Sequence, residues 1–189
     1  MLLAKKLKYT YADYLTWEEG RWEIIEGEVY DMTPAPSPRH QEIVLNLGIV
    51  LKKRLKDTSC KTFIAPIDLV LSDTDVVQPD IVVVCDKHQI TEKNIMGPPK
   101  LVIEVLSFST AQKDLIIKKR LYEKYKIEEY LIVHPLEMYI EQYCLQENIY
   151  GVASIYTPHD ILSLCSLEGI EIPLWEIFGI ERRDKQKNA

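Results

Sequence analysis

The stretch Leu101-Val102-Ile103-Glu104-Val105-Leu106 indicates how the rest of the chain folds. A continuous apolar run of this length is typical of a strand that is covered on both faces. Glu104 interrupts the run, and an ionised carboxylate that is buried without a partner costs several kcal/mol. We therefore expect a cation, a metal ion or a dense set of hydrogen-bond donors to face Glu104.

A second carboxylate opens another apolar run. Asp80 follows Gln78-Pro79 and precedes Ile81-Val82-Val83-Val84-Cys85. If the two runs form neighbouring strands, Asp80 and Glu104 can meet at one point. Two hard oxygen donors at one point are typical of a site for Mg²⁺ or Mn²⁺.

The size and composition of the chain predict one globular domain, residues 1–189. Its 189 residues are 47% hydrophobic, which is enough for a packed core. The apolar stretch at the N-terminus is too short for a signal peptide, and no segment approaches the roughly 20 apolar residues that cross a bilayer. We expect a soluble, cytoplasmic protein without a membrane partner.

The cysteines and the overall charge exclude some classes of site. Cys60, Cys85, Cys144 and Cys165 are scattered without a C-x-x-C pair, so neither zinc nor disulfides are expected. A net charge of −6 argues mildly against binding nucleic acid through the overall field of the protein. Clusters of basic residues at 52–56 and 113–126 leave a local basic surface open, although a solvated helix face is the simpler interpretation.

Hydrophobic periodicity predicts a core in the order helix, strand, strand, strand, helix, strand. The first helix begins after Ser37, with Ser37 as N-cap and Pro38 at the first helical position. The capping-box pattern Ser109-Thr110-Ala111-Gln112 opens the second helix, which reaches about Tyr125. The strands are expected at residues 62–71, 79–85, 101–106 and 129–133. Outside the core we expect a helix at 11–19, a hairpin at 22–30 with its turn near Gly27, and a further hairpin from strands near 138–146 and 150–156.

The second core helix carries a lysine on its inward face. Projected at about 100° per residue, this face holds Ala111, Leu115, Lys118, Leu121, Tyr122 and Tyr125, with Asp114 at its edge. Lys113, Lys119, Arg120 and Lys126 lie away from its centre. Lys118 can approach the strand of Glu104, or it can lay its stem over the core and extend its charge to solvent.

Six segments follow one another along most of the chain. They are Trp22-Glu23-Ile24-Ile25-Glu26-Gly27-Glu28, Ser37-Pro38-Arg39-His40-Gln41, Val77-Gln78-Pro79-Asp80, Ile103-Glu104-Val105-Leu106-Ser107, Asp114-x-x-x-Lys118-x-x-x-Tyr122 and Glu129-Tyr130-Leu131-Ile132-Val133. Their order and spacing over about residues 10–178 resemble the bacterial "putative restriction endonuclease" family of the PD-(D/E)xK nuclease superfamily.

The resemblance implies both a fold and an activity. The fold is α/β and restriction endonuclease-like, an αβββαβ core with a mixed central sheet flanked by helices, an N-terminal helix and hairpin, and a C-terminal β-hairpin. The activity is a metal-dependent endonuclease that hydrolyses phosphodiester bonds of double-stranded DNA with Mg²⁺ or Mn²⁺. A homodimer is expected, because two cuts on a duplex suit a two-fold assembly.

The chain departs from the superfamily pattern at one position and from the family pattern at two more. The lysine of a D/E-x-K motif would fall at Leu106, which cannot orient water, so the resemblance implies a migrated lysine at Lys118. Phe108 stands where the family usually has proline, and His134 where it usually has aspartate.

The resemblance assigns roles to the polar residues. Asp80 and Glu104 would hold the metal ion, and Lys118 would orient the attacking water or stabilise the charged phosphorane. Glu23, His40, Asp114 and Tyr122 are expected to support them. Glu23 has the alternative of a solvent-facing strand residue and His40 that of a core histidine. A further acid, Asp68, is either a site carboxylate or an edge-strand charge.

Two other classes of protein remain open. One is a catalytically inactive descendant that binds nucleic acid or a protein partner. The other is an α/β protein in which the acids form structural ion pairs and Lys118 only neutralises Glu104. Retention of Asp80, Glu104 and Lys118 together favours the enzyme, because buried charges are costly to keep without a use.

Overall fold

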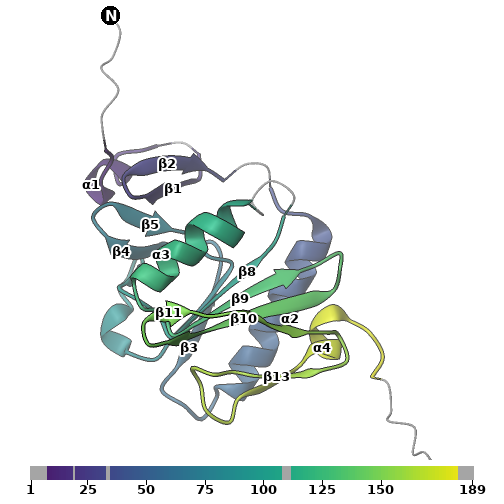
Figure 1. The fold of residues 1–189 in the computed structure, drawn as a ribbon. Coiled ribbons are helices and arrows are strands. Elements are labelled where there is room, and N and C mark those ends of the chain that lie inside the picture. The colour runs from purple at the N-terminus through teal and green to yellow at the C-terminus, as the bar shows by residue number, and fades with distance from the viewer. Residues whose placement is uncertain (1–7, 19, 33–34, 108–111, 183–189) are drawn as a thin grey trace, which may run out of the picture.

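A mixed sheet lies at the centre of the computed structural model, which describes residues 8–18, 20–32, 35–107 and 112–182 (Figure 1). Along the sheet the strands are ordered β11-β10-β9-β8-β6-β3, and β12 also pairs with β10. In the described part of this sheet, only β8 and β9 run parallel, and its other neighbouring strands are antiparallel. The strand bounds are β3 Lys61–Ile64, β6 Ile81–Val84, β8 Leu101–Val105, β9 Glu129–His134, β10 Tyr139–Gln146, β11 Ile149–Tyr150 and β12 Ser154–Tyr156.

Helices cover both faces of this sheet. Figure 1 shows α2 (Pro38–Arg54) on one side and α3 (Lys119–Lys124) on the other. Alternate strand residues serve the two faces: Ile81 and Ile103 pack with α2, whereas Val82 and Val102 pack with α3. Since both sets of side chains are buried, the strands read as continuous apolar runs. The expected α/β fold with a mixed sheet between helices is confirmed.

The start of α2 agrees with the sequence. Ser37 is the N-cap, and its side chain accepts a hydrogen bond from the backbone N–H of His40. Pro38 takes the first helical position, where its missing N–H costs nothing. This cap fixes where the helix begins and brings His40 into its first turn.

A second sheet stands beside the first, in the order β2-β1-β5-β4-β7. Glu26 and Gly27 form the turn of the expected hairpin with φ of 53° and 81°, and Gly27 tolerates that positive φ best. The helix α1 (Tyr11–Tyr14) is shorter than expected, because the chain turns after Leu15 and the Trp17 ring packs on Tyr14 instead. The strand bounds are β1 Trp22–Ile25, β2 Glu28–Asp31, β4 Leu69–Ser72, β5 Asp75–Val77 and β7 Ile95–Met96.

The single strand expected at 62–71 is wrong. The structure divides it into β3 in the central sheet and β4 in the second sheet. The break comes at Pro66, which has no N–H to continue a ladder of hydrogen bonds. The chain therefore passes from one sheet to the other close to Asp80, whose backbone carbonyl accepts a hydrogen bond from the Ala65 N–H.

The helix after β8 also differs from the prediction. Ser109, Thr110 and Ala111 of the expected capping box lie outside the described residues. From Lys113 to Lys118 the backbone is a π-helix, termed η2, and the α-helical geometry of α3 begins at Lys119. A π-helical turn changes the angle between successive side chains, so the 100° projection does not hold over this segment.

The C-terminal third contains the expected hairpin of β10, β11 and β12. Another hairpin follows, β13 (Ile161–Ser163) with β14 (Glu171–Pro173), and leads into α4 (Leu174–Phe178). The helix α4 joins the apolar cluster of α2 through Leu174, Ile177 and Phe178. Within the described residues no helix is both long and apolar enough to cross a membrane.

The expectation of no disulfides is wrong. The structure joins Cys60 to Cys85 and Cys144 to Cys165. The antiparallel pairing of Lys61 with Val84 brings the first pair together although 25 residues separate them in sequence. Spacing along the chain carries no trace of such strand pairing, which is why the cysteines looked unrelated.

Two leucines of α2 provide a test of this packing. Leu47 has 0% of its surface exposed and Leu45 has 55%. We predict that Leu47→Ala lowers the free energy of unfolding by about 2–5 kcal/mol, because it leaves a cavity in the core. The control Leu45→Ala should change it by no more than about 0.5 kcal/mol. Urea unfolding measures both, and equal losses would contradict the orientation of α2.

Candidate active site

The register of two strands brings Asp80 and Glu104 together. Ile81 of β6 pairs with Ile103 of β8 in antiparallel fashion, so the residues one step outward, Asp80 and Glu104, face each other. The Asp80 N–H donates to Glu104 Oε2 at 3.4 Å, and the Val105 N–H donates to Asp80 Oδ2 at 2.8 Å. The two carboxylates thus meet at the edge of the sheet.

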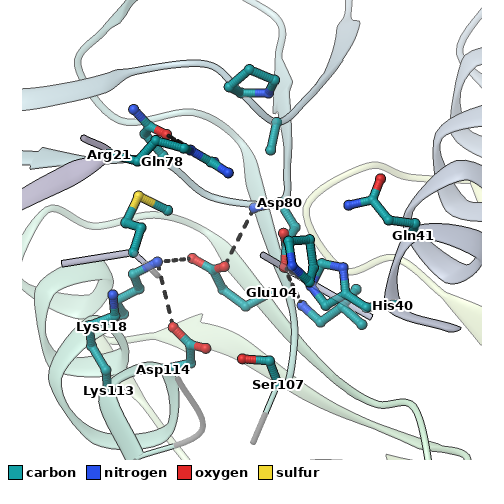
Figure 2. A pocket seen from close by; sticks show the side chains of 15 residues that line it. Arg21, His40, Gln41, Gln78, Asp80, Glu104, Ser107, Lys113, Asp114 and Lys118 are labelled. Atoms are coloured by element: carbon teal, nitrogen blue, oxygen red, sulfur yellow. Dashed lines mark hydrogen bonds and ion pairs between the residues drawn. The ribbon is translucent and has the colours of Figure 1, made fainter. Parts of the chain in front are cut away.

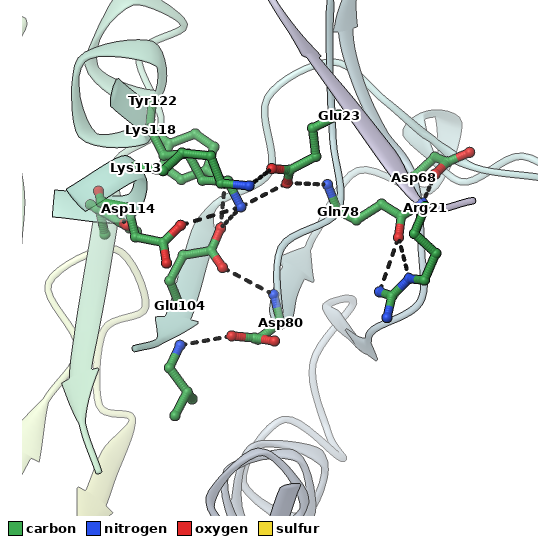
Figure 3. Close-up of polar contacts among 12 residues, drawn as sticks. Arg21, Glu23, Asp68, Gln78, Asp80, Glu104, Lys113, Asp114, Lys118 and Tyr122 are labelled. Carbon is green, nitrogen blue, oxygen red and sulfur yellow. Dashed lines mark hydrogen bonds and ion pairs between the residues drawn. The ribbon is translucent and has the colours of Figure 1, made fainter. Parts of the chain in front are cut away.

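Lys118 reaches the same place from η2 (Figure 3). Its Nζ lies 2.9 Å from Glu104 Oε1, 2.7 Å from Glu23 Oε1 and 3.5 Å from Asp114 Oδ1. The Tyr122 hydroxyl donates to Glu104 Oε1 at 2.8 Å. Lys118 is only 2% exposed, so the alternative in which it extends its charge to solvent is wrong.

Glu23 is part of this cluster and not a solvent-facing strand residue. Its exposed fraction is 0%, and it comes from β1 of the second sheet. Glu23 Oε1 accepts from the Gln78 N–H at 3.0 Å, and Oε2 lies 2.5 Å from the Nζ of Lys113. Glu23 therefore joins the two sheets through a buried set of charges.

Lys113 belongs to this cluster, although its spacing along the helix predicts a position away from the inward face. The π-helical turn brings its side chain inward, where it is 11% exposed and paired with Glu23. The only sequence signal that Lys113 belongs to the cluster was its position next to Asp114. An α-helical projection at about 100° per residue places Lys113 away from the inward face.

His40 and Asp68 take different places. His40 Nε2 lies 3.1 Å from Asp80 Oδ2, so the histidine is both buried and next to the carboxylates. Burial lowers the pKa of His40, but its hydrogen bond to Asp80 and the charge of that carboxylate outweigh this and raise the pKa overall. Asp68 lies outside the cavity lining and accepts hydrogen bonds from Tyr14 and Gln78, each at 2.9 Å.

These side chains surround a cavity of about 230 Å³ (Figure 2). Asp80, Glu104, Lys113, Asp114 and Lys118 line it, with His40, Gln41, Gln78 and Arg21 around them. Met32, Pro36 and Pro66 add apolar walls. All three residues expected to be catalytic, Asp80, Glu104 and Lys118, therefore reach one common space.

Comparison with protein families agrees with this geometry. The Uma2 family, described as "putative restriction endonuclease", matches residues 11–174, which span the core helices, both sheets and every residue of the cluster. The chain belongs to this family. An uncharacterized protein from Synechocystis sp. is 28% identical over 165 residues, covering 85% of this chain and 86% of that protein.

A solved structure supports the fold of this Uma2 family member. The crystal structure of a "putative nuclease" from Anabaena variabilis superposes with a TM-score of 0.74 at 19% sequence identity. The match covers 90% of this chain and 97% of that one. At this level of identity the likeness shows the fold, and the expected restriction endonuclease-like class is confirmed.

The carboxylates of the cluster outnumber its lysines. Four carboxylates, those of Glu23, Asp80, Glu104 and Asp114, gather around two lysines. Burial is the main cause that raises the pKa of Glu104 to about 8; Lys118 opposes it, and the nearby acids add to it. Lys118 and Lys113 outweigh burial at Glu23 and lower its pKa.

This imbalance fits a divalent cation. The pKa of Lys118 is raised well above its ordinary value, because its three acidic neighbours outweigh its burial, so its ammonium stays charged. Glu104 is nevertheless short of positive charge. Asp80 and Glu104 offer hard oxygen donors at one edge of the cavity, which is the donor set that Mg²⁺ and Mn²⁺ prefer.

The raised pKa of Glu104 predicts a pH-dependent cost in the metal-free protein. In the folded protein Glu104 keeps its proton up to about pH 8, whereas in the unfolded chain it loses the proton near its ordinary pKa of 4.5. The contribution of this group to stability is therefore fully present below pH 4.5 and is lost as the pH rises through 8. The stability of Glu104→Gln, which cannot ionise, should therefore rise by a few kcal/mol relative to that of the wild type across this window.

Urea unfolding in EDTA at several pH values measures this difference. The control is Glu92→Gln, at an exposed loop position, where the difference from the wild type should not follow pH. A stability difference between Glu104→Gln and the wild type that is constant from pH 4.5 to 8 would show that the site holds Glu104 ionised throughout.

Proposed function

We propose that the protein is a metal-dependent endonuclease that hydrolyses phosphodiester bonds in DNA. The observation that supports this most is the meeting of Asp80, Glu104 and Lys118, from three separate elements, at one cavity. Membership of a family described as "putative restriction endonuclease" points to the same class of reaction. Asp80 and Glu104 are the proposed ligands of Mg²⁺ or Mn²⁺.

The chemistry that a bound divalent ion supplies is a lower pKa for a coordinated water and neutralisation of charge on the phosphate. The rest of the proposed mechanism belongs to the side chains. Asp80 is oriented by the Val105 N–H and by His40, at 2.8 and 3.1 Å, which aims its second oxygen at the cavity. Glu104 is oriented by Tyr122 and Lys118, which leaves its Oε2 toward Asp80.

Lys118 is the proposed electrostatic catalyst. Its ammonium lies at the cavity lining among Glu23, Glu104 and Asp114, and the contact to Asp114, the longest at 3.5 Å, is the one that its third N–H would exchange for a group in the cavity. There it would orient the attacking water or meet the negative charge that develops on the phosphate oxygens. A fixed donor of this kind contributes roughly 3–4 kcal/mol to lowering a reaction barrier.

The finer features of the proposal concern the assembly and the substrate. We propose double-stranded DNA as the substrate, a homodimer as the working form and a single domain over residues 1–189. A two-fold assembly suits two cuts on a duplex. A cytoplasmic location fits access to DNA, while the two disulfides count against it, because thiols in that compartment are kept reduced.

A second candidate is an inactive descendant that binds nucleic acid or a protein. The observation in its favour is that Lys118 already pairs with three carboxylates and so balances part of the cluster without a metal ion. A nuclease assay separates the two. Supercoiled plasmid and a labelled RNA are each incubated with the purified protein in Mg²⁺, Mn²⁺ or EDTA, and cutting only with metal supports the enzyme. No cutting of either substrate under any of these conditions favours the inactive descendant.

Metal binding is the most direct prediction about the two ligands. We expect Asp80→Asn and Glu104→Gln each to abolish measurable binding of Mn²⁺ in calorimetry, because each removes one anionic oxygen donor and keeps the shape of the side chain. The control Asp68→Asn lies just outside the cavity and should bind as the wild type does. Circular dichroism checks that all three variants are folded. Equal affinity in all of them would remove the assignment of the ligands.

Lys118 should separate metal binding from cleavage. We predict that Lys118→Met keeps or strengthens Mn²⁺ binding, since a competing cation is lost, while cleavage of plasmid slows on the order of a hundredfold or more. The control is Lys119→Met at the neighbouring position, whose ammonium lies over the Tyr143 ring, 3.8 Å from its centroid. Lys119→Met should cleave normally. Unchanged cleavage by folded Lys118→Met would exclude the proposed role of the lysine.

A further inference from the structure

An arginine stands at the mouth of the cavity, two residues before Glu23. Arg21 immediately precedes β1, and its carbonyl accepts a hydrogen bond from the Met32 N–H at 3.0 Å, so the pairing with β2 continues one step before Trp22. Because side chains alternate along such a strand, Arg21 and Glu23 share the face that looks toward the cavity, whereas Trp22 points to the other face and packs on Trp17. Glu23 is fully buried at the base of the cluster, and Arg21 is exposed at the rim. In Figure 2 the guanidinium lies across the cavity from Asp114 and Ser107.

A neutral side chain holds this guanidinium. Nη2 and Nε of Arg21 donate to Oε1 of Gln78 at 3.1 and 3.4 Å. The amide of Gln78 is itself fixed, because its Nε2 donates to Asp68 at 2.9 Å and to the Tyr14 hydroxyl at 3.0 Å. Its backbone N–H donates to Glu23. Figure 3 shows Gln78 between Glu23 and Arg21, so one residue connects the floor of the site to its rim.

No described carboxylate neutralises the charge of Arg21 through an ion pair. Among the residues that the structure describes, no carboxylate oxygen lies within 4.0 Å of a nitrogen of Arg21. The Arg21 Nη1 also makes no hydrogen bond to any of these residues. Arg39 differs, since Glu42 pairs with its Nη1 and the Phe178 carbonyl with its Nη2, each at 2.8 Å. A guanidinium carries five N–H donors, so Arg21 has donors left to offer an anion in the cavity mouth.

We propose that Arg21 binds a backbone phosphate of the nucleic acid, next to the phosphate at Asp80 and Glu104. The inference rests on the proposed function and adds the contact that fixes the strand at the cavity mouth. When the phosphate to be cleaved lies at Asp80 and Glu104, the next phosphate of the same nucleic-acid strand must pass the rim of the cavity, where Arg21 lies. The planar fork of arginine matches two phosphate oxygens. On a protein of net charge −6, a local cation at this point opposes the repulsion of a polyanion.

Such a contact positions the substrate without reading its sequence. Losing it should weaken binding equally for unrelated sequences and reduce the salt dependence of binding by about 0.9 in the slope of log K against log salt, the share of one phosphate. The test uses Arg21→Gln, with Arg21→Lys as the conservative variant. The matched control is Arg54→Gln, an exposed arginine 14 residues after His40 on α2, about 21 Å along the helix axis.

Binding is measured by fluorescence anisotropy with two short labelled DNA duplexes of unrelated sequence. Each is titrated over a range of salt in Ca²⁺ and in EDTA, so that affinity does not depend on cleavage. We expect Arg21→Gln to bind both duplexes about tenfold more weakly with the reduced slope, the loss of one charge-assisted contact. Arg21→Lys should recover the slope and part of the affinity, and Arg54→Gln should match the wild type.

The outcomes separate this inference from the proposed function. If the wild type binds and cuts DNA while Arg21→Gln keeps the same affinity and slope, Arg21 makes no phosphate contact and the nuclease proposal stands. If Arg21→Gln loses affinity for one duplex only, the residue reads bases and the phosphate assignment is wrong. If the wild type binds neither duplex in Ca²⁺ or EDTA and cuts none, both proposals fail together.

Discussion

The burial of Glu104 is the constraint on which the rest of the structure depends. A strand covered on both faces leaves no water for a carboxylate, so the charge has to be met by protein groups. Lys118 and Tyr122 meet it from the helix side, and Asp80 donates its N–H from the adjacent strand. Lys118 in turn needs Glu23, which comes from the other sheet. One buried carboxyl group is thereby the point at which β8, η2 and β1 meet.

The features that could be predicted from sequence are those with a local physical signature. Continuous apolar runs indicated the strands of Asp80 and Glu104, and the Ser37-Pro38 cap marked the start of α2 correctly. The inward position of Lys118 followed from its apolar neighbours one turn away. The meeting of Asp80 and Glu104 also required β6 and β8 to be neighbours, which the sequence analysis expected; their antiparallel register, which decides that these two residues face each other, has no local signature.

The features that were missed depend on tertiary contacts. The break at Pro66 splits an apolar run that looks continuous, because the two halves join different sheets. Lys113 turns inward through a π-helical turn that no residue pattern marks. The first disulfide follows from the pairing of β3 with β6 across 25 residues, and the second joins Cys144 of β10 to Cys165 in the loop after β13, 21 residues away. The neutral partner of Arg21 is Gln78, which lies 57 residues away in sequence, in the connection between β5 and β6.

The π-helical turn has a consequence for where this chain can change in length. Turns of this kind sit inside ordinary α-helices as an irregularity of about one residue. Removing one residue between Asp114 and Lys118 would restore regular winding and rotate every preceding side chain by about 100° around the axis relative to α3. An insertion or deletion in this short segment is therefore expected to displace Lys113 and Asp114 from the cluster, whereas a change of length in an exposed connection would leave the cluster in place.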